Sequence, residues 1–338
     1  MTNAEPRFLR RVRARLLGFA AIAFSLAMLT GVATAGTASA WSWNDDGRIV
    51  KEYVWSDAMA RNIPVSFMPS ARGGNHALIL LDGLRARDDF SGWDIETNAF
   101  DKFRNDNINV VMPIGGQSSW YADWNAPSAI NGQDFTYKWE TFLSVELPNY
   151  LANVHGIARD HNAIAGLSMG GSAALYFAAK YKPYYSFAGS FSGYLHNSMI
   201  GMPAGISIGM LDAGSFNAGD MYGSASSLNP EWVSHDPFNF APELRGISLY
   251  ISAASALPNP DPVNGDRPQS LLDYYNTTNG MALEGLALAN SRIFQARLNS
   301  LNIPATYSFP PVGIHSWNNW SAELDKARPQ ILDATNGW

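Results

Sequence analysis

The sequence predicts an α/β fold: a single domain in which helices cover both faces of a mostly parallel central sheet. Three observations support this. Short apolar runs alternate with helical stretches along the 338 residues, and no repeat or linker divides them. A hydrophobic fraction of 46% also suits one large buried core.

Five apolar runs bounded by turn residues are the predicted strands, since such runs fit strands buried on both faces of a parallel sheet. They are residues 77–81, 108–113, 163–167, 187–190 and 247–252. Helices are predicted between them at residues 139–151, 171–181 and 285–298.

Residues 1–40 have the pattern of a signal peptide. Five arginines between Arg7 and Arg15 precede an apolar stretch, and Ala38-Ser39-Ala40 gives a small-x-small cleavage site, which leaves residues 41–338 as the mature domain. The alternative is an uncleaved membrane anchor. Removing residues 1–40, which carry a net charge of +4, leaves a mature charge of −10. Such an acidic chain is a poor partner for nucleic acid, and the absence of cysteine excludes disulfides.

A G-x-S-x-G motif centred on Ser168 follows the predicted strand 163–167 and opens the next helix. The chemistry needs a sharp strand-to-helix turn that exposes the serine, and flanking glycines relieve the crowding of that turn. The motif therefore predicts an α/β-hydrolase fold and an acyl-transfer nucleophile at Ser168.

A serine nucleophile needs a base, which in this fold lies C-terminal to it. Three histidines qualify: His196, His235 and His315. Only His315 lies in a late loop fixed by glycine and prolines, so we predict it as the base. The other two are interpreted as surface or hydrogen-bonding histidines.

The acid of the triad stays open on the residues alone. Asp261, Asp266, Asp273 and Glu284 all lie between the serine and the histidine. General fold logic favours Asp261 or Asp266, although both lie in a polar, proline-rich loop. Glu284 lies among apolar residues, where pairing with an imidazole would explain a carboxylate.

The loop after strand 77–81 is predicted to complete an oxyanion hole. Its glycine lets the Leu84 N–H face the site, with the Met169 N–H as partner. Asp82 and Arg85 are then placed to bind a polyhydroxylated substrate. The alternative is a local surface ion pair between them.

Residues 199–223 do not fit the alternation, because they are rich in Gly, Ala, Met and Ile. We interpret them as a loop packed against the core. The alternative is a flexible apolar wall for a long acyl chain, since methionine and small residues adapt to apolar ligands.

Several stretches together resemble the mycolyltransferases of the antigen 85 family, in the family's order and over nearly the whole mature chain. They are LLDGLRARDDFSGWD, VVMPIGGQSSWYADW, TYKWETFLSVELP, AIAGLSMGGSAAL, DAGSFNAGDMYG and FPPVGIHSWNNW.

The resemblance implies an α/β-hydrolase fold, a triad of Ser168, Glu284 and His315, and transfer of a mycolyl group between trehalose esters, or onto cell-wall arabinogalactan or a protein. By position, Leu84 and Met169 are the oxyanion donors, while Asp82, Arg85 and Trp317 contact sugar. No cofactor or metal is implied. The expected location is outside the cell, in the envelope.

Three departures from the family stand out. Residues 124–137 lack the cysteines of the mycobacterial members, Glu96 replaces an asparagine, and residues 255–279 match poorly, which is more like a corynebacterial-type member. The alternative functions are a carboxylesterase of the same fold and a secreted protein that binds fibronectin, to which antigen 85 proteins are also linked.

Overall fold

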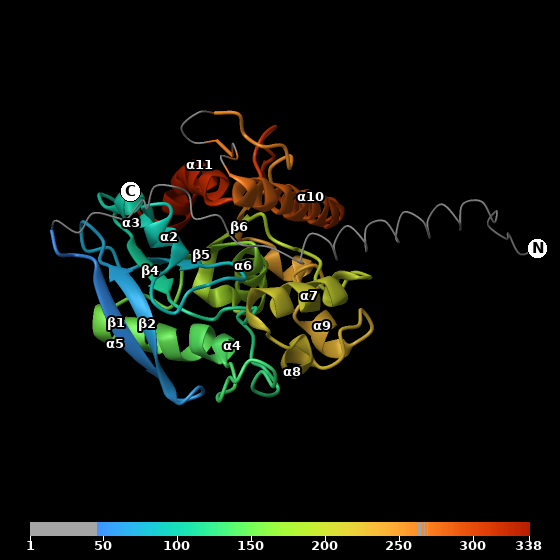
Figure 1. Cartoon of the computed structure of the whole chain (residues 1–338). Coiled ribbons are helices and arrows are strands. Elements are labelled where there is room, and N and C mark those ends of the chain that lie inside the picture. The colour runs from blue at the N-terminus through green and yellow to red at the C-terminus, as the bar shows by residue number, and fades with distance from the viewer. Residues whose placement is uncertain (1–45, 262–264, 267, 269) are drawn as a thin grey trace, which may run out of the picture.

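One eight-stranded sheet organises the chain, with the order β1-β2-β4-β3-β5-β6-β7-β8. Figure 1 labels β1, β2, β4, β5 and β6 of this sheet. β1 and β2 form an antiparallel hairpin at one edge, β2 is antiparallel to β4, and every other neighbouring pair is parallel. The strands are β1 (Val50–Ser56), β2 (Arg61–Met68), β3 (Ala77–Leu81), β4 (Asn109–Pro113), β5 (Asn162–Leu167), β6 (Tyr185–Phe191), β7 (Ser248–Ser252) and β8 (Thr306–Ser308).

The computed structural model describes residues 46–261, 265–266, 268 and 270–338. The predicted signal peptide therefore lies outside the described residues. Among the helices of the described part, none is long and apolar enough to cross a membrane.

The helices cover both faces of the sheet, as predicted. α6 packs on β5 and β6 from one side, and α11 packs on β5, β6 and β7 from the other. The helices are α2 (Gly92–Ile95), α3 (Ala99–Phe103), α4 (Trp139–Thr141), the π-helical η1 (Phe142–Glu146), α5 (Leu147–His155), α6 (Met169–Lys180), the 3-10 turn η2 (Lys182–Tyr184), α7 (Met202–Gly214), α8 (Ala218–Tyr222), α9 (Pro230–Ser234), the 3-10 turn η3 (Ala241–Leu244), α10 (Leu271–Ser300) and α11 (Trp317–Thr335).

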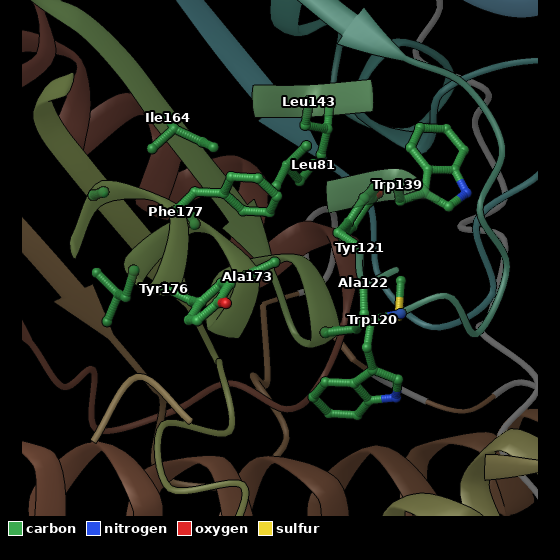
Figure 2. Close-up of a cluster of buried hydrophobic side chains, with 14 of the residues drawn as sticks. Leu81, Trp120, Tyr121, Ala122, Trp139, Leu143, Ile164, Ala173, Tyr176 and Phe177 are labelled. Carbon is green, nitrogen blue, oxygen red and sulfur yellow. The ribbon is translucent and has the colours of Figure 1, made fainter. Parts of the chain in front are cut away.

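Two hydrophobic clusters fill the two faces. The larger joins strand residues such as Leu81 and Ile164 to Ala173 and Phe177 of α6, as Figure 2 shows. The smaller packs α2, α3 and α11 on the opposite face. Burial of this much apolar surface is the main force that holds the helices on the sheet.

Five predicted strands and three predicted helices are present, but residues 199–223 are not a loop. They form α7 and α8. The sequence predicts no helix here because the glycines and Pro203 of this segment have low helix propensity. α10 also begins at Leu271, earlier than the predicted residue 285. Its start is fixed by Ser270, whose hydroxyl accepts a hydrogen bond from the Asp273 N–H at 3.1 Å.

An aromatic clasp joins the ends of the cysteine-free segment 124–137. The Trp124 N–H donates to the Tyr137 carbonyl at 2.8 Å, and the two rings meet edge to face, with their centroids 5.3 Å apart. Phe216 packs against both rings. We name Trp124, Tyr137 and Phe216 the aromatic clasp.

The strand register brings four loops to one edge of the sheet. Leu81 of β3 pairs with Gly166 of β5, and Phe191 of β6 pairs with Leu167 on one side and with Ser252 of β7 on the other. Because these strands are parallel, the loops that follow them converge at their carboxyl ends, where ligands bind in open α/β sheets.

Candidate active site

Ser168 lies at a sharp turn between β5 and α6. Its φ of 53° and ψ of −119° place a non-glycine residue in the left-handed half of backbone space. Strain of this kind costs about 1–3 kcal/mol, and it persists where the surroundings enforce it. The turn points Ser168 into a cleft, as the motif predicts for a nucleophile elbow.

The flanking glycines are required by backbone contacts. A Cβ atom on Gly166 would lie 2.4 Å from the carbonyl carbon of Gly170, and one on Gly170 would lie 2.5 Å from the carbonyl oxygen of Asp82. Both neighbours are backbone atoms, one in the turn itself and one in the residue that follows β3, so neither is the movable end of a side chain. The elbow therefore needs glycine at both positions.

We expect Gly170→Ala to destabilise the protein by about 3 kcal/mol, since overpacking against backbone forces β3 and the elbow apart. Gly285→Ala is the matched control: its nearest neighbour would be the Ala256 Cβ at 3.7 Å, inside α10. This control should raise stability by about 0.5–1 kcal/mol. Urea unfolding measures both, and equal stability of the two variants would contradict the steric argument.

His315 and Glu284 form a hydrogen-bonded pair. The Nδ1 atom of His315 lies 2.9 Å from Oε2 of Glu284. Since Nδ1–H donates to the carboxylate, Nε2 is left as the nitrogen that can take a proton. His315 and Ser168 both line the cleft.

Glu284 is held from its other side by three more donors. Its Oε1 atom accepts from the Ser192 hydroxyl at 2.8 Å, the Ala254 N–H at 2.6 Å and the Asn319 side chain at 3.3 Å. The residue is fully buried. A buried carboxylate with this many donors is fixed in position, so it fixes the orientation of the imidazole in turn.

The other candidate acids lie elsewhere. Asp266 accepts hydrogen bonds from the Ser316 hydroxyl at 3.0 Å and from the Asn259 N–H at 2.9 Å, and so supports the loop beside His315. Asp261 is exposed in the same proline-rich region, and Asp273 lies in the first turn of α10. Among the four candidates, Glu284 is the one bonded to His315.

The two remaining histidines bond to carboxylates outside the cleft. His196 lies 2.8 Å from Asp236 through Nδ1, and its ring stacks on Phe238. His235 lies 3.4 Å from Glu140. Both positions agree with their interpretation as hydrogen-bonding histidines.

The cleft holds about 310 Å³, within the range of small-molecule sites. Of the eight predicted site residues, Glu284 lies behind His315 and the other seven line the cleft: Asp82, Leu84, Arg85, Ser168, Met169, His315 and Trp317. Leu84 follows β3, while Met169 is the first residue of α6. A backbone N–H there has no partner within its helix, so it suits an oxyanion.

Asp82 is a buried carboxyl on the cleft wall. Burial raises its pKa to about 7, although hydrogen bonds from the Gly92 N–H and the Ser91 hydroxyl oppose the rise. Arg85 does not pair with Asp82. It bonds to Asp212 of α7, so the predicted alternative of a local ion pair between Asp82 and Arg85 is wrong.

Asp82 predicts a pH dependence of stability. The pKa of Asp82 is raised in the folded state, so the folded protein binds this proton more tightly than the unfolded chain does. The resulting contribution to the free energy of unfolding is complete below pH 4 and is lost as the pH rises through 7. The shift corresponds to about 4 kcal/mol at most. We expect Asp82→Asn to flatten this part of the profile, measured by urea unfolding at pH 5 and pH 8. An unchanged difference between the two pH values would assign the effect to other groups.

Several residues line the cleft besides those predicted individually. Ile206, Gly209 and Asp212 of α7 line one wall, which agrees with the apolar-wall alternative for this segment. Tyr194 lines the cleft beside His315, and its ring stacks on the imidazole, with centroids 6.0 Å apart. These residues reach the site through the topology, because β6 lies beside β5 and α7 follows β6.

Residues 56–331 match the Esterase family, described as "Putative esterase". Among characterised relatives, the diacylglycerol acyltransferase/mycolyltransferase Ag85B of Mycolicibacterium smegmatis is 39% identical over 333 residues, covering 96% of this chain and 98% of the relative. Ag85C of Mycobacterium avium is 38% identical, covering 94% and 86%. The chain belongs to the Ag85 family.

Solved structures agree with this membership. MPT51 (FbpC1) of Mycobacterium tuberculosis superimposes with a TM-score of 0.72 at 31% identity, covering 85% of this chain and 98% of that one. The serine hydrolase FphF of Staphylococcus aureus gives 0.58 at 17% identity, which supports the α/β-hydrolase fold alone. The predicted fold is therefore confirmed, as is the predicted membership of the Ag85 family.

Proposed function

We propose that this Ag85-family protein is an exported serine acyltransferase that moves a mycolyl group from trehalose monomycolate to an acceptor hydroxyl. The observation that carries the proposal is the arrangement of Ser168, His315 and Glu284 at the cleft. Export rests on the signal-peptide pattern of residues 1–40, with cleavage near Ala40.

In the proposed mechanism, the Ser168 hydroxyl gives its proton to Nε2 of His315 while Oγ attacks the ester carbonyl of the donor. Glu284 stabilises the imidazolium. The Leu84 and Met169 N–H groups stabilise the negative charge on the carbonyl oxygen. The imidazolium then protonates the departing trehalose oxygen, which leaves a Ser168 ester.

In the second half-reaction, transfer to the acceptor, these roles are reversed. An acceptor hydroxyl gives its proton to His315, and its oxygen attacks the acyl carbon. The bond between that carbon and Oγ then breaks, and Oγ takes the proton back from His315. Trehalose monomycolate, arabinogalactan and a protein hydroxyl all carry the required group.

The lining of the cleft supports separate binding regions for the acyl chain and for the sugar of the donor. Ile206 of α7 and Leu283 of α10 supply apolar walls, which suit the acyl chain. Asp82, Arg85 and Glu96 supply polar side chains that bind sugar hydroxyls. Glu96 is the residue that departs from the mycobacterial pattern, and we expect it to alter sugar preference. Trp317 offers an aromatic face beside them.

The test is intact-mass analysis of the mature protein incubated with trehalose monomycolate, with Ser168→Ala in parallel. We expect a mycolyl-sized adduct on the wild type alone, together with released trehalose. An adduct on both proteins, or none on either, would overturn the proposal. Adding trehalose as acceptor then measures transfer against hydrolysis, and dominant hydrolysis would favour a carboxylesterase.

A further inference from the structure

An ion pair between Arg85 and Asp212 joins the loop after β3 to α7 at the cleft. The Nη2 group of Arg85 donates a hydrogen bond to Oδ2 of Asp212, and both residues line the cleft. Arg85 directly follows Leu84, the predicted oxyanion donor. The two side chains are 30% and 23% exposed, so a ligand in the cleft can reach the pair.

The position of Asp212 does not favour its own helix. α7 ends at Gly214, so the carboxylate lies in the last turn, where the negative end of the helix dipole disfavours an anion. A partly exposed ion pair also contributes little to the stability of a protein. The contact with Arg85 is therefore better explained by a use at the cleft than by stabilisation of the fold.

One loop fixes both sides of this contact. The Ser118 N–H donates to the Leu84 carbonyl at 2.9 Å, which holds the backbone next to Arg85. The side-chain amide of Gln117 donates to the Ala213 carbonyl at 2.6 Å, which holds the end of α7. Because these two donors are neighbours in the chain, the carboxylate of α7 is kept at a set place relative to the loop after β3.

Asp212 is the one hydrogen-bond partner of the Arg85 side chain among the residues that the structure describes. An arginine side chain has many rotamers, and ordering it only when a ligand binds weakens the binding. A guanidinium has five N–H donors. The contact with Asp212 uses one of them, so the guanidinium is held in place while its other donors stay available for hydroxyl groups.

We propose that Asp212 is a positioning residue, which orders the Arg85 guanidinium before a sugar acceptor binds. The proposal rests on the proposed function, in which Arg85 binds sugar hydroxyls. Asp212 then acts on the binding of the sugar and not on the reacting atoms. Its loss should raise KM for the sugar and leave kcat unchanged.

The test measures transfer of a butyryl group from p-nitrophenyl butyrate to trehalose. First-turnover release of p-nitrophenolate reports acylation, and the butyryl-trehalose formed at increasing trehalose concentrations gives KM and kcat for the acceptor. For Asp212→Ala we expect KM for trehalose to rise about three- to tenfold, the scale of ordering one long side chain on binding. The acylation rate and kcat should stay within twofold of the wild type.

Two further variants show whether the effect belongs to this contact. Asp212→Asn keeps an amide oxygen that can accept from Arg85, so its KM should lie between those of the wild type and Asp212→Ala. Asp101→Ala is the matched control. Asp101 of α3 pairs with Arg104, the two side chains are 20% and 19% exposed, and neither residue lines the cleft. This control should leave KM for trehalose unchanged.

A double substitution separates positioning from direct contact with the sugar. Since Asp212 acts through Arg85, adding Asp212→Ala to Arg85→Ala should change KM by less than twofold. An equal rise of KM in both backgrounds would mean that Asp212 binds the sugar by itself, and it would overturn the proposal. An unchanged KM for Asp212→Ala, or a loss of acylation equal to the rise in KM, would also overturn it.

Failure of the proposed function is recognised in the wild-type protein. A wild type that forms no butyryl-trehalose would overturn the proposed function and the role of Asp212 with it. Normal transfer by the wild type, with a KM that Asp212→Ala does not change, would overturn the role of Asp212 alone.

Discussion

Ser168→Ala should lower kcat for ester substrates by about 10⁶-fold, the scale seen when the nucleophile of a serine triad is removed. Without Oγ no acyl-enzyme forms, and only the oxyanion donors and binding remain to assist direct attack by water. Release of p-nitrophenolate from p-nitrophenyl butyrate measures the loss. The fold should persist, because alanine keeps the Cβ atom and removes only the hydroxyl.

Ser190→Ala is the control for this loss. Ser190 is a fully buried serine on β6, the strand beside β5, and its hydroxyl has no partner among the described residues. The substitution removes the same atom without touching the cleft, so kcat should stay within twofold. Substantial activity in Ser168→Ala would mean that another group carries the acyl chain.

The second large effect is expected for Glu284→Gln, which should reduce kcat by about 10⁴-fold. The reason is that the two carboxylate oxygens of Glu284 have different partners. Oε1 accepts three hydrogen bonds, so the amide oxygen of glutamine will occupy that position and its NH₂ group will face His315. Nδ1 must then accept, which places the imidazole proton on Nε2, where the base is needed.

Glu323→Gln controls for the removal of a buried charge. Glu323 of α11 is 1% exposed and accepts from the Tyr250 hydroxyl at 2.8 Å and from Lys326 at 2.6 Å. It does not line the cleft. This variant should lose stability, measured by urea unfolding, and keep its kcat. If Glu284→Gln retained more than a tenth of wild-type kcat, the tautomer argument would fail.

The buried parallel strands are predictable from sequence because each is a short apolar run. The hairpin of β1 and β2 is not predicted, since β1 mixes polar and apolar residues without a regular alternation and β2 contains Pro64. β8 has only three residues, too few to show a pattern. The central strands can thus be recognised from their own residues, whereas the edge strands form because they pair with adjacent strands.

The site divides in the same way. Ser168 follows from its motif and His315 from its order in the chain. Glu284 could be selected only through the family resemblance, because the residues alone left four carboxylates open. Tyr194 had no signal, since nothing in its local sequence indicates that the chain after β6 brings it to the wall of the cleft.

The aromatic clasp has a consequence for where the protein can reach its native state. The clasp is held by a backbone hydrogen bond and by packed aromatic rings, and the chain contains no cysteine thiol. Folding therefore needs no oxidant and no disulfide isomerase. The protein should fold equally well in a reducing cytoplasm and in an oxidising envelope, and thiol-modifying reagents should not change its stability.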